Sequence, residues 1–183
     1  PSGVLRADLA ARWGLGSGVV VAGGAGDNAA TACGLGVTRP GDAFVSLGTS
    51  GVLFAANASY MPNPQSAVHT FCHAMPDAWH QMGVILSATD SLNWLSGISG
   101  KSAHELDALV GGRLKAPSGV TFLPYISGER TPHNDADIRG VFAGLSRETE
   151  LAGLAQGVME GVAFAFRDCL EALKAAGTQP TRA

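Results

Sequence analysis

Two short apolar runs, residues 43–47 and 52–56, are separated by only four residues, Gly48 to Gly51. A connection this short cannot return the chain to the start of a parallel strand, so the two runs are predicted to pair as an antiparallel β-hairpin. Two further strands are expected at residues 68–75 and 79–86, with a turn at Pro76-Asp77 between them. Because helical segments surround these strands, the sequence favours a mixed α/β layout over an all-parallel, doubly wound sheet.

Helical spacing of apolar residues recurs along the chain, and most of the predicted helices end at glycine. Ser102 and Glu105 form the sequence pattern of a capping box at the start of one of them. In the longest helix, Gly153, Gly157 and Gly161 recur every four residues, which predicts close packing of another element against that face. The predicted helices cover residues 5–13, 28–35, 88–98, 102–110 and 149–176.

A glycine turn from Gly23 to Asn28 follows residues 19–22, which are expected to form a buried strand. Asp27 then stands at a helix N-terminus, where the helix dipole favours the charged form of a carboxylate. Two roles are open: an N-terminal cap, or a general base that accepts a proton from a hydroxyl group. Asn28 can donate to the same hydroxyl groups or to the backbone.

The same stretch also satisfies a loose dinucleotide-binding pattern, with Gly24, Gly26 and Ala29 between a strand and a helix. Asp27 would then repel the pyrophosphate, and the next strand does not end on an acidic residue that could hold a ribose. A dinucleotide-dependent dehydrogenase is therefore the weakest alternative.

The hairpin tip from Gly48 to Gly51 has two interpretations. It is an ordinary turn, or it is a loop whose free amides and the hydroxyl groups of Thr49 and Ser50 face phosphate oxygens. A carboxylate base and a phosphate-binding turn, each at the end of a strand, together suggest phosphoryl transfer to a hydroxyl group.

Other polar residues carry weaker signals. The group His69, Cys72 and His73 suggests a metal site, but on a strand Cys72 points away from both histidines, so no metal ligand is assigned. Arg130 could reach a phosphate, although a structural role is favoured. Asn93 could line a pocket beside Trp94, which is expected in the core.

The composition limits the partners. The net charge of −3 provides no basic patch for nucleic acid or an anionic membrane, and the uncharged runs are too short to span a bilayer. Three cysteines without a CxxC motif are typical of reduced thiols, which favours the cytoplasm. Charged residues make up only 15% of the chain and glycines number 25, so part of the surface is expected to be covered by a segment outside these residues. We therefore interpret the chain as a piece of a longer protein.

Five motifs in this order and spacing resemble the FGGY family of carbohydrate kinases, and within it the branch that phosphorylates D-xylulose. The motifs, which extend over almost the whole chain, are GDNAA, SLGTSG, AVHTFCHA, FLPYISGERTPHN and GVFAGL.

The resemblance implies a ribonuclease H-like, actin-like α/β fold with a mixed sheet and flanking helices, in two domains with the active site between them. Residues 1–39 would end the N-terminal, sugar-binding domain, and residues 40–183 would begin the C-terminal, nucleotide-binding domain. It implies that Asp27 is the catalytic base and binds the sugar with Asn28. On the ATP side it implies Gly48, Thr49 and Ser50 at the phosphates, with Thr89 and Asn93 on the nucleotide side.

The function implied is phosphorylation of D-xylulose to D-xylulose 5-phosphate with ATP and Mg²⁺. L-ribulose, glycerol and gluconate stay open as substrates, as does a non-catalytic protein that binds sugar or nucleotide. The partners implied are the sugar, ATP and the remainder of the full-length chain, with a homodimer left open. These 183 residues alone are expected to be inactive, because the family's acidic residue for magnesium and its adenosine loop match nothing here.

Overall fold

The computed structural model of the protein describes residues 2–112 and 116–183. In chain order the elements are β1 (Gly3–Val4), α1 (Ala7–Arg12), β2 (Val20–Val21), α2 (Asp27–Leu35), β3 (Ala43–Leu47), β4 (Gly51–Asn57), a 3-10 turn (Pro64–Ser66), β5 (His69–Cys72), β6 (Trp79–Ile85), α3 (Thr89–Ser99), α4 (Ala103–Val110), β7 (Thr121–Leu123), β8 (Val141–Ala143) and α5 (Leu151–Ala175).

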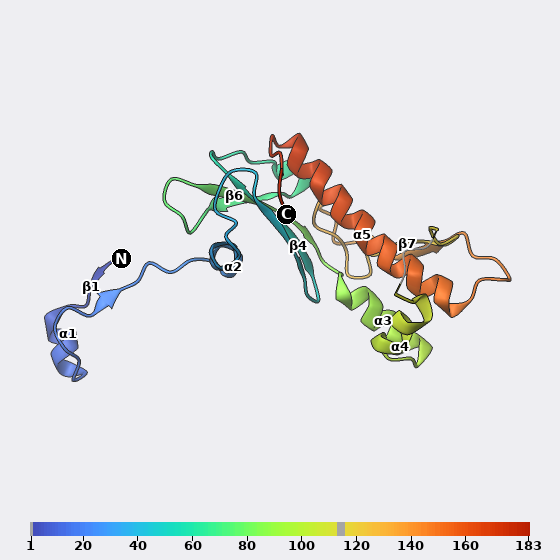
Figure 1. The fold of residues 1–183 in the computed structure, drawn as a ribbon, viewed down its shortest axis with the longest axis horizontal. Coiled ribbons are helices and arrows are strands. Elements are labelled where there is room, and N and C mark those ends of the chain that lie inside the picture. Colours follow the sequence, from blue (N-terminus) through green and yellow to red (C-terminus); the bar gives the residue numbers. More distant parts are fainter. Residues whose placement is uncertain (1, 113–115) are drawn as a thin grey trace.

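An antiparallel sheet of four strands, in the order β3-β4-β6-β5, forms the centre of the fold (Figure 1). The predicted hairpin is confirmed, because Leu47 of β3 pairs with Gly51 of β4 across the short turn. On its other side β4 pairs with β6, which places Ile85 beside Gly51. β5 completes the sheet at the edge, paired with β6 as expected.

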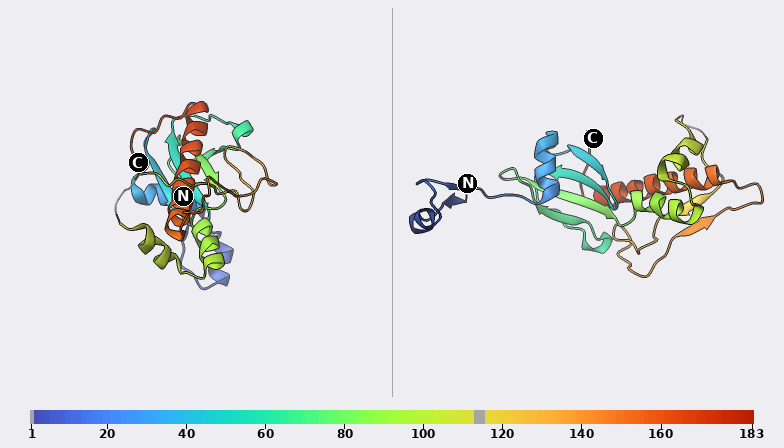
Figure 2. Two further views of the ribbon diagram at one scale, coloured as in Figure 1. Left: turned by 90° about the vertical axis from the view of Figure 1, so that its right-hand side faces the viewer. Right: turned by 90° about the horizontal axis from the view of Figure 1, so that it is seen from below.

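Helices cover both faces of this sheet, so the body has three layers (Figure 2). On one face, α2 packs over a cluster that includes Phe54, Met82 and Val84. On the other face, the C-terminal half of α5 packs over Leu53, Ile85 and their neighbours. The approach of α5 is so close that a Cβ atom on Gly83 would lie 2.6 Å from the Cβ atom of Cys169. Because successive side chains of a strand point to opposite faces, the sheet has one apolar face under α2 and a second under α5.

The N-terminal half of α5 lies beyond the sheet and packs against β7, α3 and α4. Its glycines explain how β7 reaches the helix: a Cβ atom on Gly157 would lie 3.0 Å from the Val120 carbonyl oxygen, and one on Gly161 would overlap the Phe122 carbonyl oxygen. The predicted close packing is thus confirmed for these two positions. At Gly153 the packing is looser: Ser118 Oγ donates to the Gly153 carbonyl oxygen at 3.0 Å, but it would lie 4.0 Å from a Cβ atom on that residue.

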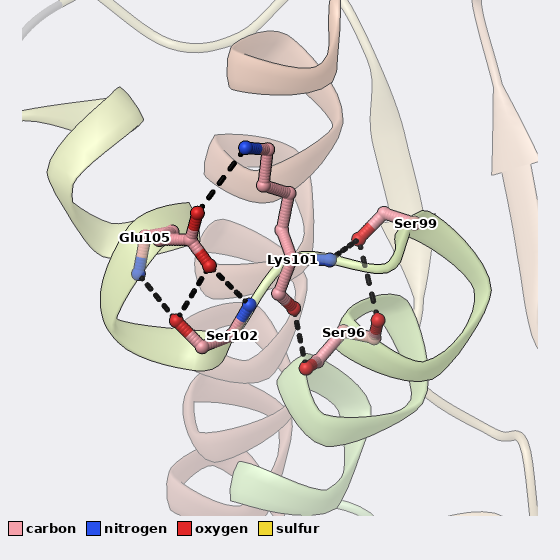
Figure 3. A network of polar contacts seen from close by, with 5 residues as sticks. All are labelled: Ser96, Ser99, Lys101, Ser102 and Glu105. Carbon is pink, nitrogen blue, oxygen red and sulfur yellow. Dashed lines mark hydrogen bonds and ion pairs between the residues drawn. The ribbon is translucent and has the colours of Figure 1, made fainter.

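The connection between α3 and α4 is fixed by a network of polar contacts (Figure 3). Ser102 Oγ accepts from the Glu105 amide at 3.2 Å, and the Glu105 carboxylate accepts from the Ser102 amide at 2.9 Å, so the capping box is confirmed. Hydrogen bonds from Ser102 and the charge of Lys101 lower the pKa of Glu105 to about 2. This network fixes where α4 begins.

The N-terminal segment lies apart from the rest of the fold in Figure 1. Its short strands β1 and β2 pair antiparallel with each other, through Gly3 with Val21 and Val4 with Val20. The expectation of a buried strand at residues 19–22 is wrong here, because Val20 and Val21 are 63% and 44% exposed. Both side chains are apolar, as expected for a buried strand, but no core of the described residues covers them.

Candidate functional site

Asp27 is the first residue of α2, directly after Gly26, which is the N-cap residue. Its Oδ1 atom accepts from the Asn28 amide nitrogen at 2.8 Å and from the Asn28 side chain at 3.3 Å. The first helical turn closes without the Asp27 side chain, through the Ala30 amide and the Gly26 carbonyl. Asp27 is therefore not the N-cap residue, and its exposed carboxylate lies where the helix dipole favours negative charge.

A pocket of about 530 Å³ opens beside Asp27. One wall comes from the start of α2 and the other from the edge of the sheet, so a ligand there would contact a carboxylate, an amide and an aromatic ring. The lining residues are Gly26, Asp27, Asn28, Ala29, Phe71, Cys72, His80 and Met82. The sequence reasoning missed Phe71, His80 and Met82 as members of this site. The alternation along β5 and β6 could have placed Phe71 beside His80, with which it is paired.

His80 forms the floor of this pocket within an aromatic cluster. Its ring stacks on Phe54 with centroids 4.5 Å apart and meets the ring of His73 edge to face. Burial, together with the nearby His73, lowers the pKa of His80 to about 4, against the effect of the Cys72 carbonyl. His80 is therefore uncharged at neutral pH, and Asp27 has no cationic partner in the pocket lining.

His73 belongs to the same cluster, and both of its ring nitrogens are engaged. Nδ1 accepts from the Met75 amide at 3.1 Å, and Nε2 donates to the Val37 carbonyl oxygen at 3.1 Å. The described residues contain no group of three His, Cys, Asp or Glu side chains that could hold a metal ion.

The hairpin tip rests on the N-terminus of α3. The Thr49 carbonyl oxygen accepts from the Ala88 amide at 2.8 Å, and the Gly48 carbonyl oxygen accepts from the Thr89 amide at 3.0 Å. The Thr89 hydroxyl also donates to Gly48, at 2.8 Å. These bonds occupy the first amides of α3 and hold the tip in place, while Thr49 and Ser50 remain exposed.

Apart from Asn93, the predicted site residues fall into two groups. Asp27 and Asn28 line the pocket over β5 and β6, whereas Gly48, Thr49, Ser50 and Thr89 gather at the hairpin tip. Met82 is the lining residue on β6 nearest to the tip, and it lies three strand positions from Ile85, the partner of Gly51. The tip is therefore at least roughly 10 Å along the sheet from the pocket.

Asn93 lies on α3 one helical turn beyond Thr89, in a different hollow. That hollow has a volume of about 550 Å³ and is polar on several sides. Its lining residues are Asp90, Asn93, Trp94, Ile126, Ser127, Arg139 and Gly140. Trp94, expected in the core, is 36% exposed, although its ring also stacks on Phe122.

No helix in the described ranges has both the length and the hydropathy needed to cross a bilayer.

Residues 43–183 match the family model described as the FGGY family of carbohydrate kinases, C-terminal domain. Over 98% of its length the chain is 44% identical to a xylulose kinase of Escherichia coli (strain K12), of which it covers 37%. Among solved structures it is similar to a xyloylose kinase from Brucella ovis (64% identity, TM-score 0.91) and to a xylulose kinase from Rhodospirillum rubrum (34% identity, TM-score 0.85). Each structural match covers 98% of this chain and 37% of the other.

The chain therefore spans about 37% of the length of these relatives. The solved structures have the ribonuclease H-like, actin-like fold, so the fold class predicted from the sequence is confirmed.

Proposed function

This chain belongs to the FGGY family of carbohydrate kinases, and from that premise we propose that the full-length protein transfers the γ-phosphoryl group of ATP to a ketose sugar, D-xylulose above all. The observation that carries the proposal is the placement of an exposed carboxylate, Asp27, in a pocket on the same sheet as a hairpin tip of glycine and hydroxyl residues, at least about 10 Å away. Its relatives in Escherichia coli and Klebsiella pneumoniae are xylulose kinases, which supports the choice of sugar.

Asp27 is proposed to accept the proton of the reacting sugar hydroxyl, so that the oxygen attacks the γ-phosphorus as ADP leaves. Its carboxylate already accepts hydrogen bonds from Asn28 through Oδ1, which leaves Oδ2 for the sugar. Asn28 would orient the sugar through its amide. Phosphoryl transfer depends mostly on positioning, which is what a base on a helix end and a fixed hairpin tip can provide.

At the hairpin tip, Gly48, Thr49 and Ser50 are proposed to contact the phosphates. Thr89 would act by holding the tip, since its hydroxyl already donates to Gly48. Asn93, in its separate polar hollow, would contact the nucleotide beyond the phosphates.

Mg²⁺ is proposed to arrive with the nucleotide, held mainly by the phosphates. Asp27 is the one carboxylate that lines its pocket, and the described residues form no metal-binding group. The described residues therefore do not fit a metal site built by this part of the protein.

The domain assignment is part of the same proposal: residues 1–39 close the sugar-binding domain and residues 40–183 begin the nucleotide-binding domain. Closure of the two domains would exclude water from the reacting phosphate. The cytoplasm is the proposed location, and a homodimer is one proposed assembly.

The test is ADP release by the full-length protein with D-xylulose, L-ribulose, glycerol and gluconate, in parallel with Asp27→Asn. Loss of the base is expected to reduce kcat by about 10² or more with D-xylulose. Asp107→Asn, which removes an exposed carboxylate of α4 outside the pocket, is the matched control and should keep wild-type turnover. If Asp27→Asn is as active as wild type, Asp27 does not take part in the chemistry. If no sugar supports ADP release, the protein is a non-catalytic binder instead.

A further inference from the structure

A buried carboxylate outside the candidate site lies next to the segment that supports the hairpin tip. Glu129 is only 2% exposed, and its Oε1 atom accepts from the Leu86 amide at 2.9 Å and from the Arg130 amide at 2.7 Å. Its Oε2 atom is buried without a hydrogen-bond partner among the described residues. Burial raises the pKa of Glu129, because the desolvation outweighs the effect of the two amides and Arg130. A buried carboxyl group costs stability, so its presence here calls for a reason.

The chain around Glu129 lies along the last residues of β6, past the point where β5 ends its pairing with that strand. The Thr131 amide donates to the Val84 carbonyl oxygen at 3.0 Å, and the Val84 amide donates to Thr131 Oγ1 at 3.0 Å. The bond between Glu129 and Leu86 is the last of this series, one residue after β6 ends at Ile85. Residues 129–131 therefore fix the point at which the chain leaves the sheet.

Only two residues separate Leu86 from Thr89, the first residue of α3. The amides of Ala88 and Thr89 are the donors that hold the carbonyl groups of Thr49 and Gly48. Glu129 therefore holds one end of a short link, at Leu86, and the hairpin tip binds to the other end, at Ala88 and Thr89. The link is buried, because Ser87 and Ala88 are 0% and 2% exposed. A shift of Leu86 would be passed on to the tip, because so short a link has little freedom to absorb it.

We propose that Glu129 is a positioning residue for the nucleotide side of the site. By accepting from the Leu86 amide, it fixes the position of the α3 N-terminus relative to the sheet, and with it the position of the hairpin tip that α3 holds. The nucleotide part of this inference rests on the proposed function. The role requires a side-chain oxygen that accepts from Leu86, rather than a negative charge. Glutamine keeps that oxygen and the volume, whereas leucine removes the acceptor.

The test uses the full-length protein and compares Glu129→Leu with Glu129→Gln. Hydrogen exchange of the Ala88 and Thr89 amides should become about tenfold faster in Glu129→Leu, because the Leu86 amide loses its partner. The KM for ATP should rise at least about fivefold, at the scale of one lost hydrogen bond, with the KM for the sugar unchanged. Glu129→Gln should resemble wild type in both measurements.

Glu160→Leu is the matched control. Glu160 also accepts from a backbone amide, that of Ser118, at 3.1 Å, but it joins α5 to the start of β7 and does not touch the hairpin tip. Its loss should leave amide exchange at Ala88 and Thr89 as in wild type.

Unchanged exchange in a folded Glu129→Leu variant would overturn the inference, and so would a parallel rise in both KM values. If the leucine variant does not fold, the comparison of Glu129→Gln with wild type tests the inference. A raised KM for ATP at wild-type thermal stability would show that the negative charge of Glu129 matters, rather than the oxygen that accepts from Leu86. If wild-type protein releases no ADP with any sugar, the proposed function fails, while the exchange measurement still tests the role of Glu129.

Discussion

The two glycines of α5 that lie against β7 lead to a quantitative prediction for Gly161→Ala. A methyl group at Gly161 would overlap the Phe122 carbonyl oxygen and lie 3.2 Å from the Phe122 ring. Phe122 cannot move away at low cost, because it is 2% exposed and its ring packs on Phe142 with centroids 4.7 Å apart. The added methyl group must therefore displace strand or helix.

The size of the effect follows from two opposing terms. Alanine gains about 1 kcal/mol of helix propensity over glycine. Overpacking a well-packed core costs about 1–3 kcal/mol, and backbone is the hardest neighbour to move, so the upper part of that range applies. The expected net result is a loss of about 1–2 kcal/mol for Gly161→Ala. Gly153→Ala has only the Ser118 hydroxyl within reach, at 4.0 Å, so it should retain most of the propensity gain.

Thermal unfolding of the full-length variants, followed by circular dichroism, measures the difference. A loss of stability lowers the Tm, so Gly153→Ala should melt above wild type and Gly161→Ala below it. Equal increases in Tm for both variants would refute the close contact between α5 and β7.

Two further predictions concern stability. His80 has a folded-state pKa of about 4, below its unfolded value of 6.5, so the unfolded chain binds the proton first as the pH falls and stability is lost between about pH 6.5 and 4. His80→Phe should remove about 2 kcal/mol of this acid sensitivity between pH 7 and pH 4.5, measured by urea unfolding at both pH values. An unchanged pH dependence would show that His80 is not buried as described. Ser102→Ala removes the cap of α4 and should cost about 1 kcal/mol, seen as a lower Tm at unchanged turnover, whereas an unchanged Tm would mean that the capping box does not stabilise the helix.

Local patterns predicted local structure well. The capping box of Ser102 and Glu105, the β-hairpin and the close approach at Gly157 and Gly161 all depend on neighbours in sequence or on a single helix face. Gly153 differs because it faces the Ser118 side chain and not a backbone carbonyl group, which the spacing of glycines alone does not reveal.

What depended on distant segments was harder to predict. β8 escaped notice because three residues are too few for a periodic signal. The pocket beside Asp27 was half predicted: the base was found on α2, but its opposite wall required the pairing of β5 with β6 and the crossing of α2 over the sheet. Arg130 was the residue of its motif considered for phosphate binding. The neighbouring Glu129 is buried and makes the contact with Leu86 at the end of β6, which the sequence did not indicate.

The buried stripe of α5, which packs on β7 and on the central sheet, has a further consequence for how this helix can change in length. Gly157, Gly161, Ala165, Cys169 and Leu173 recur every four residues, and four residues turn a helix by 40° more than a full revolution, so the stripe winds about 160° around the axis. It faces β7 at one end and the central sheet at the other. Inserting a single residue between Gly161 and Ala165 would rotate one half by about 100° against the other. The rotation of α5 about its axis therefore has to match both β7 and the central sheet at the same time. Insertions should be tolerated at the ends of the helix but not in its middle.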